Sequence, residues 1–213
     1  MAYFLALLFV FYPTSHATET KLWLGEFSQH KLDGWEPKAF KDTTRYELQT
    51  SAGVTHLHAE SHDSASGLIK TQRIDLRQTP VLHWSWRIAT RLPRLNEQSK
   101  AGDDYAARIY VILKGGWAFW QTQAINYVWA SNSAKNSVWP NAFAGKQAMM
   151  VAVQGPKAPL NTWQNEQRNI RTDLQQLTGT DSDYIDAIAI MTDTDNSNSA
   201  ASADYGDIWF TQE

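Results

Sequence analysis

The densest group of polar side chains in the sequence lies near the C-terminus, in residues 192–207 (TDTDNSNSAASADYGD). Calcium takes six to eight oxygen ligands from carboxylates, amide carbonyls and the backbone, and alternating Asp and Asn in a loop can supply them. The alternative is a polar turn, in which such side chains hydrogen-bond to their own backbone. The segment therefore predicts either a turn or a structural calcium site with four candidate ligands, Asp193, Asp195, Asn196 and Asp204.

A second polar group, residues 102–108 (GDDYAAR), begins an alternating apolar segment. Asp104 and Arg108 stand four residues apart, so in an extended chain they share one face and could form an ion pair or bind a polar ligand together. If Arg108 is buried it needs a carboxylate partner, because an unpaired buried charge is very costly. We take Asp103, Asp104 and Arg108 as candidate ligand-binding residues, and add Asp193 from the C-terminal stretch.

The third group is residues 163–173 (WQNEQRNIRTD), in which Glu166 and Arg168 share a face if the segment is a strand. Glu166 and Asp104 are then candidates for the general acid and base of a glycoside-cleaving enzyme, whose stereochemical course depends on the distance between the two carboxyl groups. The sequence does not fix that distance. The alternative is that this segment binds a ligand without catalysis, and Arg168 and Asn169 are then the candidate binding residues.

Tryptophan is unusually abundant, with 10 residues in the chain. An indole ring on an open sheet face or loop makes a flat platform for a sugar ring, whereas an indole inside the sandwich only fills the core. The strand pattern favours the core for Trp84 and Trp86. For Trp117, Trp120 and Trp139, which stand near Gly or Pro residues, both roles stay open. Trp117 and, in a later strand, Trp129 are the candidate ligand-binding tryptophans.

Period-two alternation of apolar residues recurs along the chain, and residues 81–89 (VLHWSWRIA) are typical. This pattern predicts strands, which we place at residues 54–61, 68–76, 81–89, 105–114, 124–130, 147–154, 184–192 and 207–211. One short helix is predicted at residues 171–178, because Ile170, Leu174 and Leu177 recur at helical spacing and Gly179 follows as a stop. The elements predict an all-β, antiparallel β-sandwich of the jelly-roll type.

The composition narrows the class of protein. The 213 residues are 43% hydrophobic, which excludes a disordered chain. With 19 Lys and Arg against 22 Asp and Glu, the formal charge is −3, so binding driven by nucleic-acid phosphates is not expected. The chain has no cysteine, which excludes disulfides, thiolate metal sites and cysteine nucleophiles.

The first seventeen residues, MAYFLALLFVFYPTSHA, have the pattern of a secretory signal peptide. The apolar run at residues 3–12 is too short to cross a bilayer, and the small residues Ser15 and Ala17 stand at positions −3 and −1 of a cleavage site. The pattern predicts cleavage after Ala17, a single β-sandwich domain over residues 18–213, and a periplasmic or secreted location. No later segment reaches the length of a membrane span.

Several motifs together resemble one known family. They are LxWxWR at residues 82–87, GDDYAARIYV at 102–111, YxW at 127–129, WxxxxRNIxxD at 163–173 and TDTDN at 192–196. This combination resembles the exported bacterial family numbered 3047 among the domains of unknown function, and the resemblance runs from about residue 22 to residue 210. It implies an envelope protein and no particular activity.

The chain also resembles jelly-roll carbohydrate-binding modules at the level of fold, in its strand–turn–strand arrangement ending in the sequence DIWF. In those modules the last strand often supplies a carboxylate to a structural calcium ion. A shared fold does not by itself confer a shared function.

These observations predict a non-catalytic glycan-binding protein of the bacterial envelope, with an oligosaccharide or polysaccharide as its partner. No cofactor is required, and a structural Ca²⁺ ion is the one metal considered. The first alternative is a polysaccharide hydrolase or lyase that uses Asp104 and Glu166. The second alternative is an assembly protein whose aromatic surface binds another envelope protein.

Overall fold

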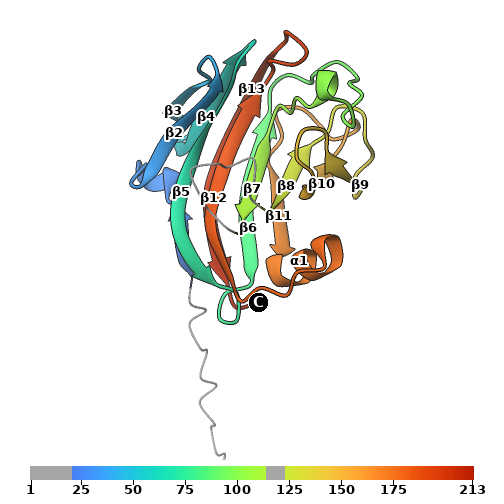
Figure 1. Ribbon diagram of the computed structural model, residues 1–213. Coiled ribbons are helices and arrows are strands. Elements are labelled where there is room, and N and C mark those ends of the chain that lie inside the picture. The colour runs from blue at the N-terminus through green and yellow to red at the C-terminus, as the bar shows by residue number, and fades with distance from the viewer. Residues whose placement is uncertain (1–20, 114–122) are drawn as a thin grey trace, which may run out of the picture.

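The protein is a sandwich of two β-sheets that lie one behind the other in the view of Figure 1. The computed structural model describes residues 21–113 and 123–213. The predicted signal peptide therefore lies outside the described residues. No helix within the described ranges combines the length and apolar character needed to cross a bilayer.

Sheet I has the strand order β11-β6-β13-β4-β3, with β1 paired to β13. Its strands are β1 (Leu22–Gly25), β3 (Arg45–Ser51), β4 (Val54–His62), β6 (Val81–Ile88), β11 (Gln164–Asn169) and β13 (Ala200–Thr211). Sheet II has the order β2-β5-β12-β7-β8-β10-β9. Its strands are β2 (Trp35–Lys41), β5 (Ala65–Asp75), β7 (Arg108–Ile112), β8 (Ala124–Trp129), β9 (Val138–Asn141), β10 (Gly145–Gln154) and β12 (Tyr184–Asp193).

The two sheets share one hydrophobic core, to which each strand contributes alternate residues. In β6 the inward residues are Leu82, Trp84, Trp86 and Ile88, all of which are buried. Trp84 stacks on Tyr127 from sheet II, with ring centroids 5.3 Å apart. Such large aromatic side chains contribute much of the apolar area that a sandwich core buries. The structure confirms the predicted all-β sandwich.

The helix α1 (Ile170–Thr178) confirms the predicted short helix and explains its limits. Asn169 caps its N-terminus, where the side-chain oxygen accepts a hydrogen bond from the backbone N–H of Thr172 at 3.0 Å. Gly179 ends the helix with a φ of 70°, a left-handed conformation that glycine adopts without a steric penalty. Two short 3₁₀ helices, η1 (Phe27–Gln29) and η2 (Lys100–Gly102), lie in the described ranges as well.

Two features of the fold differ from the prediction. The pair β8–β10 is parallel, so the sandwich is not wholly antiparallel. The polar stretch of residues 192–207 is also not one loop, because β12 continues to Asp193 and β13 already begins at Ala200. Only residues 194–199 connect the two strands, and Asp204 is therefore a strand residue.

Candidate functional site

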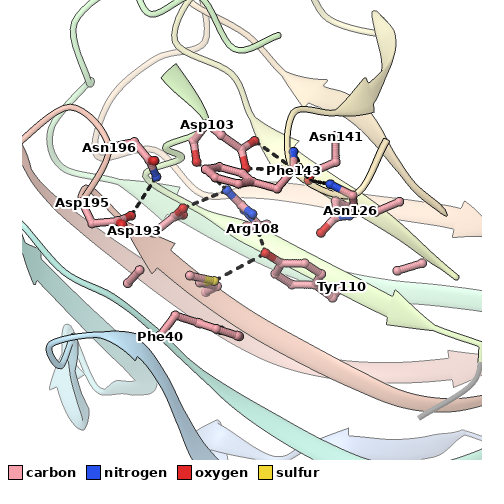
Figure 2. Close-up of a pocket in the computed structure, with 15 residues that line it drawn as sticks. Phe40, Asp103, Arg108, Tyr110, Asn126, Asn141, Phe143, Asp193, Asp195 and Asn196 are labelled. Carbon is pink, nitrogen blue, oxygen red and sulfur yellow. Dashed lines mark hydrogen bonds and ion pairs between the residues drawn. The ribbon is translucent and has the colours of Figure 1, made fainter. Parts of the chain in front are cut away.

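A cavity of about 350 Å³ lies on the outer face of sheet II, away from the shared core. Along β7, Ile109 and Val111 point into the core, so Arg108 and Tyr110 point outward between them. The neighbouring strands add Asn126 from β8 and Asp193 from β12 (Figure 2). The other lining residues are Phe40, Ala65, Asp103, Ala124, Asn141, Phe143, Ala144, Ala148, Met191, Asp195 and Asn196.

The strand order fixes how these side chains are spread across the cavity. Because β7 lies between β12 and β8, Arg108 and Tyr110 occupy the middle, with Asp193 on one side and Asn126 on the other. Tyr110 and Asn126 are directly paired across the strands β7 and β8. The cavity therefore has an acidic end and an amide end, joined by an arginine and a tyrosine.

Arg108 is buried at the centre of the site, with 3% of its surface exposed. Its Nη2 donates to Asp193 Oδ2 at 2.8 Å and to the backbone carbonyl of Asp103 at 3.1 Å, while its Nη1 donates to the Tyr110 hydroxyl. The carboxylate partner that a buried Arg108 requires is thus Asp193. Arg108 and Asp104 do not form the ion pair that their spacing allowed, because β7 begins only at Arg108 and Asp104 accepts hydrogen bonds from residues 196 and 197 instead.

Asp104 holds the loop between β12 and β13 in place. Its carboxylate accepts hydrogen bonds from the backbone N–H groups of Asn196 (3.1 Å) and Ser197 (2.7 Å), and from both of their side chains. Both oxygens are therefore occupied by structural hydrogen bonds. Asp103 has a similar partner in Asn141, whose Nδ2 donates to both carboxylate oxygens at 3.0–3.1 Å.

Asn126 is the exceptional polar residue of the cavity. Its side chain is 1% exposed, and neither its amide oxygen nor its amide nitrogen has a hydrogen-bond partner among residues 21–113 and 123–213. Buried polar groups are nearly always hydrogen-bonded, because an unmade bond costs about 1–3 kcal/mol. A buried amide at a cavity wall whose donor and acceptor are both unpaired is suited to a ligand that offers both.

Three carboxylates converge at the acidic end. Asp104, Asp193 and Asp195 each offer an oxygen atom, and these atoms lie within 4.8 Å of one another. Burial raises the pKa of the Asp193 and Asp195 carboxyl groups, and the neighbouring Asp104 adds to both shifts. Burial also raises the pKa of Asp103. The protein therefore keeps mutually repelling acid groups together, where they bind protons more readily than isolated carboxyls do.

These shifted groups predict a dependence of stability on pH. A carboxyl whose folded-state pKa is raised stabilises the fold fully below its unfolded pKa, and this contribution is lost as the pH rises through the folded pKa. We expect the melting temperature to fall as the pH rises above about 4, the ordinary value for aspartate, and to fall less in Asp195→Asn. Thermal melts of both proteins across the pH range measure this. Parallel curves for the two proteins would contradict it.

The predicted set of calcium ligands is not brought together as a whole. Asp193 and Asp195 join the acidic cluster, but Asn196 faces Asp104 with its donor nitrogen at 3.2 Å. Asp204 lies on sheet I, where it accepts a hydrogen bond from Arg87 Nε at 2.6 Å and contacts His58 Nδ1 at 2.6 Å. The inclusion of Asp204 was therefore wrong, because β13 begins earlier than predicted.

The catalytic pair proposed from the sequence is also wrong. Glu166 lies on β11 at the edge of sheet I and does not line the cavity. It accepts hydrogen bonds from Gln154 Nε2 at 2.6 Å and from the Trp86 indole at 3.3 Å. Asp104 is engaged with the loop of residues 194–199. The structure therefore does not place these two carboxyl groups on either side of one ligand.

The remaining ligand-binding candidates from residues 163–173 have structural roles near α1. Arg168 forms a two-point ion pair with Asp173, whose Oδ2 also accepts a hydrogen bond from the Tyr127 hydroxyl at 2.5 Å. Asn169 caps the helix. Neither Arg168 nor Asn169 lines the cavity.

Neither Trp129 nor Trp139 forms the aromatic platform considered from the sequence, and Trp139 is only 3% exposed. Trp129 is 2% exposed and belongs to the shared core, 6.0 Å from Trp86 between ring centroids, so it cannot bind a ligand at the surface. Trp117 and Trp120 lie outside the described residues. The aromatic rings at the cavity are instead Phe40, Tyr110 and Phe143, and Phe143 is 56% exposed.

The amino-acid sequence of this sandwich was compared with models of known protein families. The chain belongs to the family described as protein of unknown function DUF3047, whose model matches residues 33–209. No curated protein matches the chain.

Solved structures with a similar arrangement of strands share 9–11% sequence identity with the chain. A cellulose-induced protein is 11% identical, with 89% of this chain and 97% of that chain covered and a TM-score of 0.48. A family 30 carbohydrate-binding module of a Clostridium thermocellum cellulosomal cellulase is 11% identical, with 92% and 95% covered and a TM-score of 0.39. The glycoside hydrolase domain of Endo-D from Streptococcus pneumoniae R6 is 9% identical, with a TM-score of 0.43. The match covers 84% of this chain and 22% of that chain.

Proposed function

We propose that the protein binds a glycan in the cavity on the outer face of sheet II and does not react with it. The observation that carries the proposal is Asn126, a buried side-chain amide whose oxygen and nitrogen both lack partners in the described part of the chain. A sugar hydroxyl both donates and accepts hydrogen bonds, so two adjacent hydroxyls can satisfy both atoms of one amide.

The rest of the cavity agrees with this ligand class. Its volume of about 350 Å³ lies within the range of small-ligand pockets, which combine apolar walls with a few placed polar groups. The rings of Phe40 and Phe143 provide apolar surface against which the C–H face of a sugar can pack. The distance from β8 to β12 is two strand spacings, about 10 Å, which suits a unit of two sugar residues.

A binding role is favoured over catalysis because two of the acid groups at the cavity, Asp104 and Asp193, already have partners within the protein. Asp104 is saturated by hydrogen bonds from residues 196 and 197, and Asp193 is paired with Arg108. We further propose that the glycan belongs to the envelope or its surroundings, and the support for this is the signal-peptide pattern of residues 1–17.

An array of envelope and extracellular glycans, followed by calorimetric titration of each hit, tests the proposal. We expect Phe143→Ala to weaken binding about tenfold, the loss of one stacked aromatic contact of roughly 1.5 kcal/mol. The melting temperature should stay near that of the wild type, because the ring is largely exposed. Val54→Ala removes a similarly exposed apolar side chain on sheet I and is the matched control.

Two results would overturn the proposal. One is the absence of any glycan that binds across the array. The other is a Phe143→Ala variant that binds every hit as tightly as the wild-type protein.

A further inference from the structure

The acidic end of the cavity carries more negative charge than its surroundings neutralise. Four carboxylates (Asp103, Asp104, Asp193 and Asp195) lie in or beside this end, and Arg108 is the guanidinium that faces them. Four negative charges against one positive charge leave a formal excess of three. Such groups repel one another strongly when they are buried, since the protein interior screens charge poorly.

Two lysines lie near this end, and each has another contact. Lys41 Nζ pairs with Asp63 at 2.8 Å and donates to the backbone carbonyl of Asp195 at 3.3 Å, and its positive charge offsets part of the Asp195 charge without a salt bridge. Lys100 Nζ lies over the Phe143 ring, 5.3 Å from its centroid. Neither ammonium group forms a salt bridge to a carboxylate of the acidic cluster.

A ligand that satisfies the whole cavity must therefore meet two demands. It needs a positive charge where the oxygens of Asp104, Asp193 and Asp195 converge. It also needs hydrogen-bonding groups on the far side of β7, where the buried amide of Asn126 has both atoms open. The cavity is also lined by three aromatic rings, those of Phe40, Tyr110 and Phe143. The face of an aromatic ring attracts a cation, so these rings suit a positively charged ligand.

We infer that the glycan recognised by this cavity carries a free, protonated amino group, as a hexosamine unit without an N-acetyl group does. The inference rests on the proposed function and names the substrate class of the same site. The ammonium group lies against Asp193 and Asp195, and the hydroxyl groups of the adjoining sugar pair with Asn126. Hydrogen bonds between charged partners contribute about 1.5–3 kcal/mol, which is roughly 10- to 100-fold in affinity.

A divalent cation is the competing occupant of the three carboxylates, and calcium accepts such oxygen ligands. The cavity favours the amine for two reasons. A single ion fills only the acidic end of a space of about 350 Å³, and it leaves Asn126 on the other side of β7 without a partner. The amino sugar accounts for both ends with one molecule.

The test uses three β-1,4-linked tetramers that differ only in the substituent at carbon 2: glucosamine, N-acetylglucosamine and glucose. Each is titrated calorimetrically into the protein at low salt, at a pH where the sugar amine is protonated. We expect the glucosamine tetramer to bind at least tenfold more tightly than the other two. We also expect this preference to weaken in 1 M salt, which screens charge.

Asp195→Asn removes one acid group that is only partly buried and is not paired with Arg108, so the variant should fold. It is expected to reduce the preference for the glucosamine tetramer over the glucose tetramer about fivefold or more. Asp181→Asn, at a largely exposed aspartate beside α1, is the matched control and should leave this preference unchanged.

The outcomes separate this inference from the proposed function. Equal affinity for the three tetramers overturns the amine preference and leaves glycan binding intact. If none of the three tetramers binds while another glycan of the array does, the amine preference is likewise overturned and glycan binding stands. Calcium that binds alone and raises the affinity for the glucose tetramer also overturns it, because the carboxylates would then serve a metal. If no glycan binds at all, both proposals fail.

Discussion

Asn126→Leu is expected to make the protein more stable and at the same time to abolish its ligand binding. The wild-type amide is buried without a hydrogen-bond partner in the described part of the chain, and this costs about 1–3 kcal/mol. Leucine has a similar size and no polar atom to satisfy. It would pack beside the cross-strand neighbours Tyr110 and Met150. We expect the free energy of unfolding to rise by about 1–2 kcal/mol.

The two opposite effects distinguish a ligand-binding residue from a structural one. Stability is measured by denaturant unfolding, and binding by titration with the best glycan of the array. The control is Asn169→Ala, which removes a satisfied asparagine that caps α1. That variant should lose about 1 kcal/mol of stability and keep full binding. An Asn126→Leu protein that is less stable and still binds would show that the amide serves the fold.

Much of the fold could be predicted because alternation is a strong signal where one sheet face is buried. The segment of residues 81–89 fixed both the strand and its inward tryptophans, and β6 spans residues 81–88 with Trp84 and Trp86 in the core. The polar, short or Pro-containing strands β1, β2, β3 and β9 gave no such signal. The parallel pairing of β8 and β10 could not be predicted either, because alternation does not specify a strand's neighbour.

The site was only partly predictable because a period of two does not say which face is covered. Tyr127 and Trp129 share a face of β8, but that face is the core side, and all six residues of the strand are buried. The signal for the site in this strand is Asn126, the one polar residue in AINYVW. Phe143, in the turn between β9 and β10, has no periodic pattern that could have revealed it.

Arg108→Met is expected to destabilise the protein by about 3–5 kcal/mol, far more than Asp193→Asn does. Removing the arginine leaves Asp193 buried without its partner, beside three other acid groups. The arginine also donates to the carbonyl of Asp103 and to Tyr110, and both contacts are lost with it.

Asp193→Asn should cost less, about 1–3 kcal/mol, because asparagine keeps an acceptor for Arg108 and one surplus negative charge disappears. In an ordinary buried ion pair, removing either partner would be expected to lower the free energy of unfolding by a similar amount. The inequality thus reports the excess of acid in the cavity, which is the same excess that would attract a cationic ligand.

Denaturant midpoints at pH 7, compared at equal m-values, measure both losses. The control is Arg171→Met, in an exposed ion pair beside α1, and it should change stability by less than about 1 kcal/mol. In Arg108→Met the lost stability should return in part at acidic pH, where the orphaned carboxyl groups take up protons. Two results would contradict this expectation: equal losses for Arg108→Met and Asp193→Asn, or an Arg108→Met loss that does not change with pH. Either result would mean that other groups neutralise the acid residues, so that the cavity has no excess negative charge to attract a cationic ligand.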